Sequence, residues 1–260
     1  MTLHKNLLST FLLLHLFIIG AKVSESARIF TIVNHCRETV WPGVIPGEYF
    51  NGGGFALKSG PISCIHGPDC CGNSLKCSGA GKPPSSLAEF TLATLDFYDV
   101  SLVDGFNLPM SVTPLNGKGN CSIAGCDSDL RNSCPSELAV KGNGRTVACR
   151  SACDVFNTDE YCCRGNFGNP STCQPTYYSK KFKQACPTSY SYAYDDPTSI
   201  FTCKGTDYVI AFCSSRKQPV CTYHNRNLIC SDSIGLRPSM GKWWTMILGS
   251  TFVITLSMIS

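Results

Sequence analysis

Four cysteines lie close together in SGPISCIHGPDCCGNSLKC, residues 59–77, and the same segment holds a histidine and an aspartate. Side chains of these types can bind a metal ion, form a redox pair or form disulfides. Zinc sites use histidine pairs or repeated C-x-x-C steps, whereas His35, His66 and His224 stand far apart in the chain. Adjacent cysteines can bridge to different partners. The spacing therefore favours disulfides, and we expect neither a metal nor a cofactor.

The start of the chain determines the redox compartment. Residues 1–26 contain Lys5, an apolar run from Leu7 to Gly20 and then small residues, which together predict a secretory signal peptide cleaved before Ala27. An uncleaved signal anchor is the alternative, although the run is short for a membrane span. All 18 cysteines follow this segment. An even number of cysteines in a secreted chain predicts a disulfide framework.

Composition narrows the class of protein. Charged residues make up 15% of the chain and the formal net charge is +4, so nothing indicates a nucleic-acid partner. The chain contains 23 glycines and 15 prolines, and long helical periodicity is scarce. These features predict a mainly β protein with ordered loops.

The elements that must position any site are mostly strands. Alternating apolar and β-branched residues predict strands over residues 27–36 and 85–93 and within 198–213. Two further short strands are expected on either side of a turn at Asp104 and Gly105. Pro109 limits the pairing of the second of these strands.

Residues 121–186 differ in composition from the strand-forming segments. Nine cysteines are joined there by polar linkers that are rich in glycine and asparagine. Such a segment has too little apolar content to form its own core, so disulfides must replace it. A short helix is predicted at YSKKFKQACP, residues 178–187.

Several motifs together resemble the plant thaumatin-like proteins, a family of thaumatin-type pathogenesis-related proteins. The resemblance extends over residues 27–213 and rests on FTIVNHCRETVWPGV, LAEFTLA, YDVSLVDGFNLPMSVTP, CSIAGCDSDLRNSCPSELAVKG, ACRSACDVFNTDEYCCRG and CQPTYYSKKFKQACPTSYSYAYDDPTSIFTC. It implies a thaumatin-like flattened β-sandwich with disulfide-rich loop subdomains, the largest over residues 121–186. It also implies a monomeric plant defence protein with antifungal action.

The resemblance also implies a set of disulfides. The pairs are Cys36–Cys213, Cys71–Cys77, Cys121–Cys203, Cys126–Cys186, Cys134–Cys149, Cys153–Cys162 and Cys163–Cys173. This chain departs from the family near residues 60–64, where a segment with strands, an arginine and one further cysteine is missing. We expect Cys64 to pair with Cys70 instead, and Cys221 with Cys230 by elimination. A functional short form and a splice or gene-model variant both remain open.

Four carboxylates match the acidic cleft of the antifungal members of the family: Glu89, Asp99, Asp104 and Asp195. Clustered carboxylates can hold a general acid beside an ionised partner, as glycoside hydrolysis requires, or can bind sugar hydroxyls without cleavage. Taken singly, Asp104 and Asp195 also suit turns. The resemblance implies binding of β-1,3-glucan in the fungal cell wall. The alternatives are a weak endo-β-1,3-glucanase, with these carboxylates as catalytic residues, and a surface inhibitor or receptor-like scaffold.

The tail beyond residue 213 predicts a membrane anchor. A spacer over residues 214–242 precedes an uncharged apolar segment over 243–260, and small residues lie upstream. This pattern predicts a glycosylphosphatidylinositol (GPI) anchor attached at Ser231 or Ser233, on the outer face of the plasma membrane. A retained membrane span is the alternative. Without an anchor the protein would be free in the apoplast.

Overall fold

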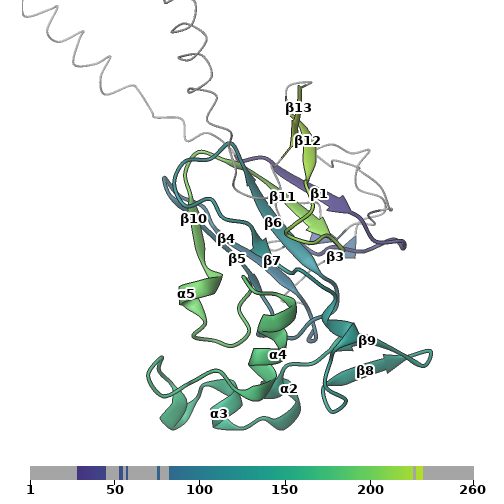
Figure 1. The fold of residues 1–260 in the computed structure, drawn as a ribbon, viewed down its shortest axis with the longest axis vertical. Coiled ribbons are helices and arrows are strands. Elements are labelled where there is room, and N and C mark those ends of the chain that lie inside the picture. Colours follow the sequence, from purple (N-terminus) through teal and green to yellow (C-terminus); the bar gives the residue numbers. More distant parts are fainter. Residues whose placement is uncertain are drawn as a thin grey trace, which may run out of the picture.

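The computed structural model describes residues 28–44, 53–54, 57, 75–76, 82–224 and 227–230. Within these residues the main body consists of two sheets (Figure 1). The larger sheet has the order β1 (Phe30–Asn34), β11 (Asp207–Phe212), β6 (Met110–Leu115) and β7 (Ala124–Gly125). The smaller sheet has the order β10 (Phe201–Cys203), β5 (Asp96–Ser101) and β4 (Leu87–Thr91).

Aromatic side chains from the inner faces pack the two sheets together. The ring of Phe30 in β1 lies 4.9 Å from that of Phe90 in β4, and the ring of Tyr208 in β11 lies 5.2 Å from that of Tyr98 in β5. Tyr98 and Tyr208 are completely buried. Packing of this kind stabilises a sandwich beyond the area it removes from water. The predicted mainly β, thaumatin-like sandwich is confirmed.

The chain builds the larger sheet from distant segments. β1 and β11 pair in parallel, with Phe30 opposite Tyr208, and β11 pairs antiparallel with β6. The two strands on either side of the predicted turn, β5 and β6, belong to different sheets. The turn at Asp104 and Gly105 therefore carries the chain from one layer of the sandwich to the other and does not close a hairpin.

Most of the helices lie in the cysteine-rich segment, below the sheets in Figure 1. Its elements are η2 (Leu130–Asn132), the hairpin β8 (Ala139–Gly142) and β9 (Arg145–Cys149), α2 (Ala152–Phe156), α3 (Asp159–Cys162), η3 (Gly165–Phe167) and α4 (Tyr177–Ala185). The predicted helix over 178–187 corresponds to α4. Phe182 and Ala185 of α4 are buried in the same core as the smaller sheet, so this helix fastens the subdomain to the sandwich.

Four short strands and one helix complete the described elements. β2 (Gly53–Gly54) pairs with β3 (Leu75–Lys76), and β12 (Cys221–His224) pairs with β13 (Asn227–Cys230). Helix α5 (Asp196–Ser199) precedes β10. No helix among the described residues is long and apolar enough to cross a membrane. The predicted signal peptide, anchor sites and apolar tail lie outside the described residues.

Six disulfides connect cysteines within the described part of the chain. They are Cys36–Cys213, Cys121–Cys203, Cys126–Cys186, Cys134–Cys149, Cys153–Cys162 and Cys163–Cys173, which are six of the pairs that the resemblance implied. The first joins residues 177 positions apart and so closes almost the whole domain. Cys64, Cys70, Cys71 and Cys77 lie outside the described residues, so their pairing stays a prediction. Cys221 and Cys230 are directly opposite in the β12–β13 ladder.

Candidate functional site

Two of the predicted site residues face each other on the smaller sheet. Glu89 in β4 and Asp99 in β5 are direct partners in the antiparallel register. Strand alternation sends the neighbours of Asp99, Tyr98 and Val100, into the core. Asp99 therefore lies on the outer face, where directly opposed side chains have Cβ atoms about 4.5–5.5 Å apart. Glu89 is exposed, whereas Asp99 is only 9% exposed.

The surroundings of Asp99 favour its protonated form. Burial, the charge of Glu89 and a hydrogen bond with Glu89, and then the charge of Asp196, raise the pKa of Asp99 from 3.8 to about 7. The Oδ1 atom of Asp99 is buried and has no hydrogen-bond partner among the described residues. Around neutral pH a large fraction of Asp99 is therefore the neutral carboxylic acid, beside the side chains of Glu89 and Asp196.

A loop that runs beside β5 adds two groups to this pair. The backbone N–H of Tyr190 donates to the carbonyl of Val100 at 2.8 Å, and the Tyr190 carbonyl accepts from Leu102 N–H at 2.9 Å. The Tyr190 hydroxyl donates to Oδ1 of Asp196 at 3.0 Å. Burial, followed by the hydrogen bond and charge of Asp196 and the charge of Asp99, raises the pKa of Tyr190. We call Glu89, Asp99, Tyr190 and Asp196 the acidic cluster.

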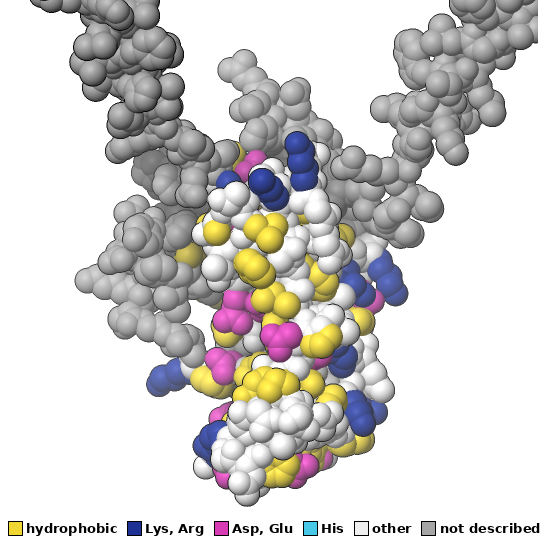
Figure 2. Space-filling model, turned by 90° about the vertical axis from the view of Figure 1, so that its left-hand side faces the viewer, with side chains coloured by type: hydrophobic (Ala, Val, Ile, Leu, Met, Phe, Trp, Pro, Cys, Tyr) yellow, Lys and Arg dark blue, Asp and Glu magenta, His cyan; other side chains and the backbone are white. Residues whose placement is uncertain are grey.

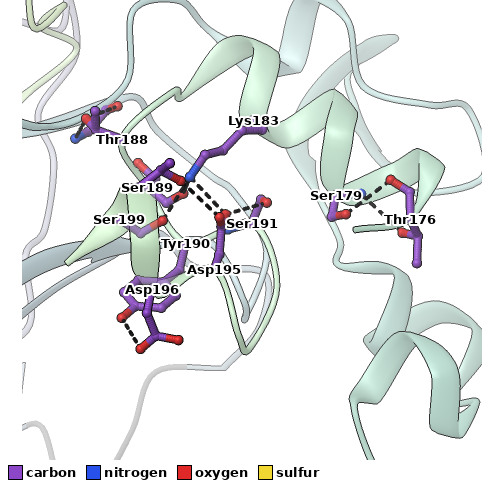
Figure 3. A network of polar contacts seen from close by, with 12 residues as sticks. Thr176, Ser179, Lys183, Thr188, Ser189, Tyr190, Ser191, Asp195, Asp196 and Ser199 are labelled. Carbon is purple, nitrogen blue, oxygen red and sulfur yellow. Dashed lines mark hydrogen bonds and ion pairs between the residues drawn. The ribbon is translucent and has the colours of Figure 1, made fainter. Parts of the chain in front are cut away.

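Asp195, the fourth predicted carboxylate, has different hydrogen-bond partners from Asp196. Its carboxylate is buried and accepts hydrogen bonds from Lys183 Nζ at 2.9 Å and from both the N–H and the hydroxyl of Ser191 (Figure 3). It also accepts a hydrogen bond from the Thr198 hydroxyl. Lys183 also donates to the carbonyl of Ser189 and the hydroxyl of Ser199. These contacts hold the loop in place. A ligand-binding role for Asp195 stays a prediction, and the structure brings Asp196 instead to the acidic cluster.

Asp104 lies at a cleft between the sandwich and the disulfide-rich subdomain. Its turn ends at Gly105, which has φ +94°, and a Cβ there would lie 2.7 Å from Pro84 Cβ and 2.8 Å from the carbonyl oxygen of Cys149. Glycine is required at such a position. The cleft has a volume of about 270 Å³, and its walls include Asp104, Ser191 and Tyr192 on one side and Tyr161, Gln174, Thr176 and Tyr178 on the other.

Tyr192 links the cleft to the acidic cluster. It lines the cleft, and burial followed by the charges of Asp195 and Asp196 raises its pKa. Figure 2 shows the side of the molecule on which β4, β5, β10 and α5 appear in Figure 1. Acidic side chains gather midway along that face, with hydrophobic side chains above and below them. Among the described residues, no group of three histidine, cysteine or acidic side chains is placed to hold a metal ion.

Two features of the site were missed by sequence reasoning. Asp196 was not among the predicted site residues, because a side-by-side aspartate pair gives no sign of which side chain faces inward. Lys183 was not singled out, although the signal was present. It follows the buried Phe182 and lies one turn after the buried Ser179 on α4, which places it beside the buried face of an amphipathic helix.

Comparisons with known proteins agree with the fold. The family model described as the thaumatin family matches residues 58–214. "Pathogenesis-related thaumatin-like protein 3.5" of Cryptomeria japonica is 48% identical over 233 residues, which covers 78% of this chain and 96% of that protein. "Pathogenesis-related protein 5" of Arabidopsis thaliana is 44% identical over 235 residues, which covers 79% of this chain and 98% of that protein. On this evidence the chain belongs to the thaumatin family, among its plant pathogenesis-related, thaumatin-like members.

Proposed function

We propose that the protein is a secreted plant defence protein that binds β-1,3-glucan of the fungal cell wall through the acidic cluster and the adjoining cleft. The observation that carries this proposal is the pairing of Asp99 with Glu89 on an outer sheet face. A protonated carboxyl can donate a hydrogen bond to a sugar oxygen, and the flanking carboxylates can accept from hydroxyls.

Cleavage would require a set separation between the two carboxyl groups of this pair. Retaining glycosidases hold their two carboxyl groups about 5–5.5 Å apart, and inverting enzymes about 6.5–9.5 Å apart, to leave room for the sugar carbon or a water. The register places the Cβ atoms of Glu89 and Asp99 about 4.5–5.5 Å apart. We keep the endo-β-1,3-glucanase as the second candidate function, and the inhibitor or receptor-like scaffold as the third.

A binding assay paired with an activity assay tests this function. The wild-type protein should sediment with insoluble β-1,3-glucan and release no reducing ends from a soluble linear β-1,3-glucan. Glu89→Gln should weaken sedimentation, because it removes one carboxylate of the pair. Glu38→Gln makes the same change at an exposed position outside both the cleft and the acidic cluster, and should bind as the wild type does.

The outcomes separate the three functions. Release of reducing ends that Glu89→Gln abolishes would establish the glucanase. Equal sedimentation of the wild type and Glu89→Gln would refute binding through the acidic cluster. Failure of the folded wild type to bind would leave the scaffold function as the explanation.

The location that we propose is the outer face of the plasma membrane, or the apoplast. Six disulfides in one domain are typical of proteins that fold in an oxidising compartment. The anchor at Ser231 or Ser233 is part of this proposal. A phospholipase specific for phosphatidylinositol should release the protein from intact expressing cells. Retention of the protein, with peptides of the 243–260 segment still in the mature chain, would show a membrane span instead.

A further inference from the structure

Four aromatic side chains gather on the disulfide-rich subdomain, and we call them the aromatic cluster: Phe156 of α2, Tyr161 of α3, and Tyr177 and Tyr178 of α4. The ring of Phe156 lies 5.3 Å from that of Tyr161 and 5.3 Å from that of Tyr178. The Tyr161 and Tyr178 rings are 5.6 Å apart. Tyr177 is 62% exposed and Phe156 38% exposed. Large aromatic side chains left in water at this density are typical of a binding surface.

The backbone that carries these rings is held firmly. Helices α2 and α3 are short, and each begins at a capping side chain, Ser151 and Thr158 respectively. The disulfide Cys153–Cys162 ties α2 to α3. A second disulfide, between Cys163 and Cys173, ties the end of α3 to the segment before α4. Rings fixed in this way lose little conformational entropy when a ligand packs against them.

Tyr178 is oriented by a single strong contact. Its hydroxyl donates to Oε1 of Glu137 at 2.8 Å. That hydrogen bond, followed by burial and the charge of Glu137, raises the pKa of Tyr178 to about 12. The phenol therefore stays neutral at physiological pH. Its ring presents an uncharged surface to the cleft.

Two of the four rings of the aromatic cluster line the cleft that Asp104 also lines. Tyr161 and Tyr178 line it from the subdomain, whereas Asp104, Ser191 and Tyr192 line it from the sandwich. A pyranose ring has an apolar face of C–H groups and a rim of hydroxyls, so an aromatic wall facing a polar wall suits it. The acidic residues Asp154 and Glu160 also line the cleft, which disfavours a phosphate-bearing ligand.

We propose that the aromatic cluster is a second sugar subsite, in which Tyr161 stacks on a pyranose ring of a neutral polysaccharide chain. The chain would pass from the acidic cluster into the cleft. This inference rests on the proposed function and deepens it, because it predicts that the preferred ligand is a chain long enough to reach both places. Short oligosaccharides would fill only one of them.

Two substitutions at Tyr161, together with a control substitution elsewhere, separate ring stacking from other roles. Tyr161→Phe keeps the ring and should bind soluble linear β-1,3-glucan as the wild type does. Tyr161→Leu keeps apolar bulk but removes the ring, and should bind the polysaccharide about ten-fold more weakly. Trp41→Ala is the matched control, because Trp41 is an aromatic side chain that is 63% exposed and does not line the cleft. Thermal unfolding of each variant verifies that it is folded.

The affinity of each variant is measured for the polysaccharide and for its disaccharide, with Glu89→Gln alongside. Stacking in the cleft predicts that Tyr161→Leu removes most of the preference for the longer ligand. If folded Tyr161→Leu binds the polysaccharide as tightly as the wild type while Glu89→Gln does not, the aromatic subsite is wrong and the proposed function stands. If Tyr161→Leu weakens binding and Glu89→Gln has no effect, the aromatic subsite stands and the role of the acidic cluster fails. If the wild type binds neither ligand, both fail.

Discussion

Lys183 offers the sharpest test of how the fold holds its candidate site. Its ammonium group is the only cation that contacts Asp195 among the described residues, and it donates three hydrogen bonds of 2.8–2.9 Å, to Ser189, Asp195 and Ser199 (Figure 3). Burial lowers the pKa of Lys183, while the hydrogen bond and charge of Asp195 oppose that shift. The substitution Lys183→Met removes the charge and the donors but keeps an unbranched apolar stem of similar length.

The size of the effect follows from what Asp195 would lose. Removing one partner of a buried ion pair costs about 3–5 kcal/mol, because the other charge remains without compensation. Asp195 would keep its hydrogen bonds from Ser191 and Thr198, and the Lys183 side chain is 25% exposed, so the lower end of that range applies. We expect the free energy of unfolding to fall by about 3 kcal/mol. For a domain of this size, that corresponds to a melting temperature lower by roughly 6–12 °C.

Thermal unfolding followed by circular dichroism, with the disulfides intact, measures the loss. Lys180→Met is the matched control, because Lys180 is exposed on the same helix and should change stability by less than about 0.5 kcal/mol. The double variant Lys183→Met with Asp195→Asn removes both charges. It should therefore be more stable than Lys183→Met alone.

Two results would refute this reasoning. A loss below about 1 kcal/mol would show that the pair behaves like an exposed salt bridge. A double variant no more stable than Lys183→Met would show that the charge left on Asp195 is not the cause of the loss.

Three further predictions concern other parts of the described chain. The raised pKa of Asp99 lets the folded protein keep a proton that the unfolded chain releases. The contribution of Asp99 to stability therefore falls as the pH rises from about 4 to about 7. Asp99→Asn should unfold at a higher temperature than the wild type at about pH 8, with little difference at about pH 4. A smaller gain at about pH 8 than at about pH 4 would contradict that sign. Gly105→Ala should lower the urea midpoint more than Gly144→Ala, because both glycines have positive φ but only Gly105 has no room for a Cβ; equal losses would contradict this. Peptide mapping without reduction should find Cys221 linked to Cys230, since the two are register partners, and free thiols at both would exclude the bridge.

Local patterns predicted the strands and the helix that dominate the fold. The alternating segments 27–36 and 85–93 contain β1 and β4, and the helix expected over 178–187 appears as α4, shifted by one or two residues. These elements follow from side-chain periodicity, which is a property of neighbouring residues. The six bridges came from the family resemblance, because cysteine spacing alone does not determine connectivity.

The pairing of strands that are far apart in the chain could not be predicted from those local patterns. β5 and β6 stand on either side of one turn, yet they enter different sheets, because β6 pairs with β11 far along the chain and β5 pairs with β4 and β10. The same limit applies to Asp195 and Asp196. Which of the two turns inward depends on Lys183, and Lys183 reaches the loop only because α4 packs against the sandwich core.

The acidic cluster lowers the stability of the fold, and the disulfides offset this loss. Burying Asp99 opposite Glu89 and near Asp196 opposes the ionisation of Asp99, so the arrangement costs stability near neutral pH. In the chain-entropy model, each disulfide that closes a long loop stabilises the folded state by several kcal/mol. Cys121–Cys203 closes such a loop at β10, in the sheet that carries the pair. Cys126–Cys186 closes another at the end of α4, the helix that supplies Lys183.

A cluster that served only the fold would be more stable with Asp99 replaced by an amide, because the amide keeps the shape without the repulsion. The chain instead keeps a carboxyl that is nine-tenths buried and leaves one of its oxygens without a partner among the described residues. Destabilising polar groups persist in proteins chiefly where a ligand uses them, while the rest of the structure supplies the stability that they cost. The disulfide bracing and the Lys183 network supply such stability around the binding site that we propose.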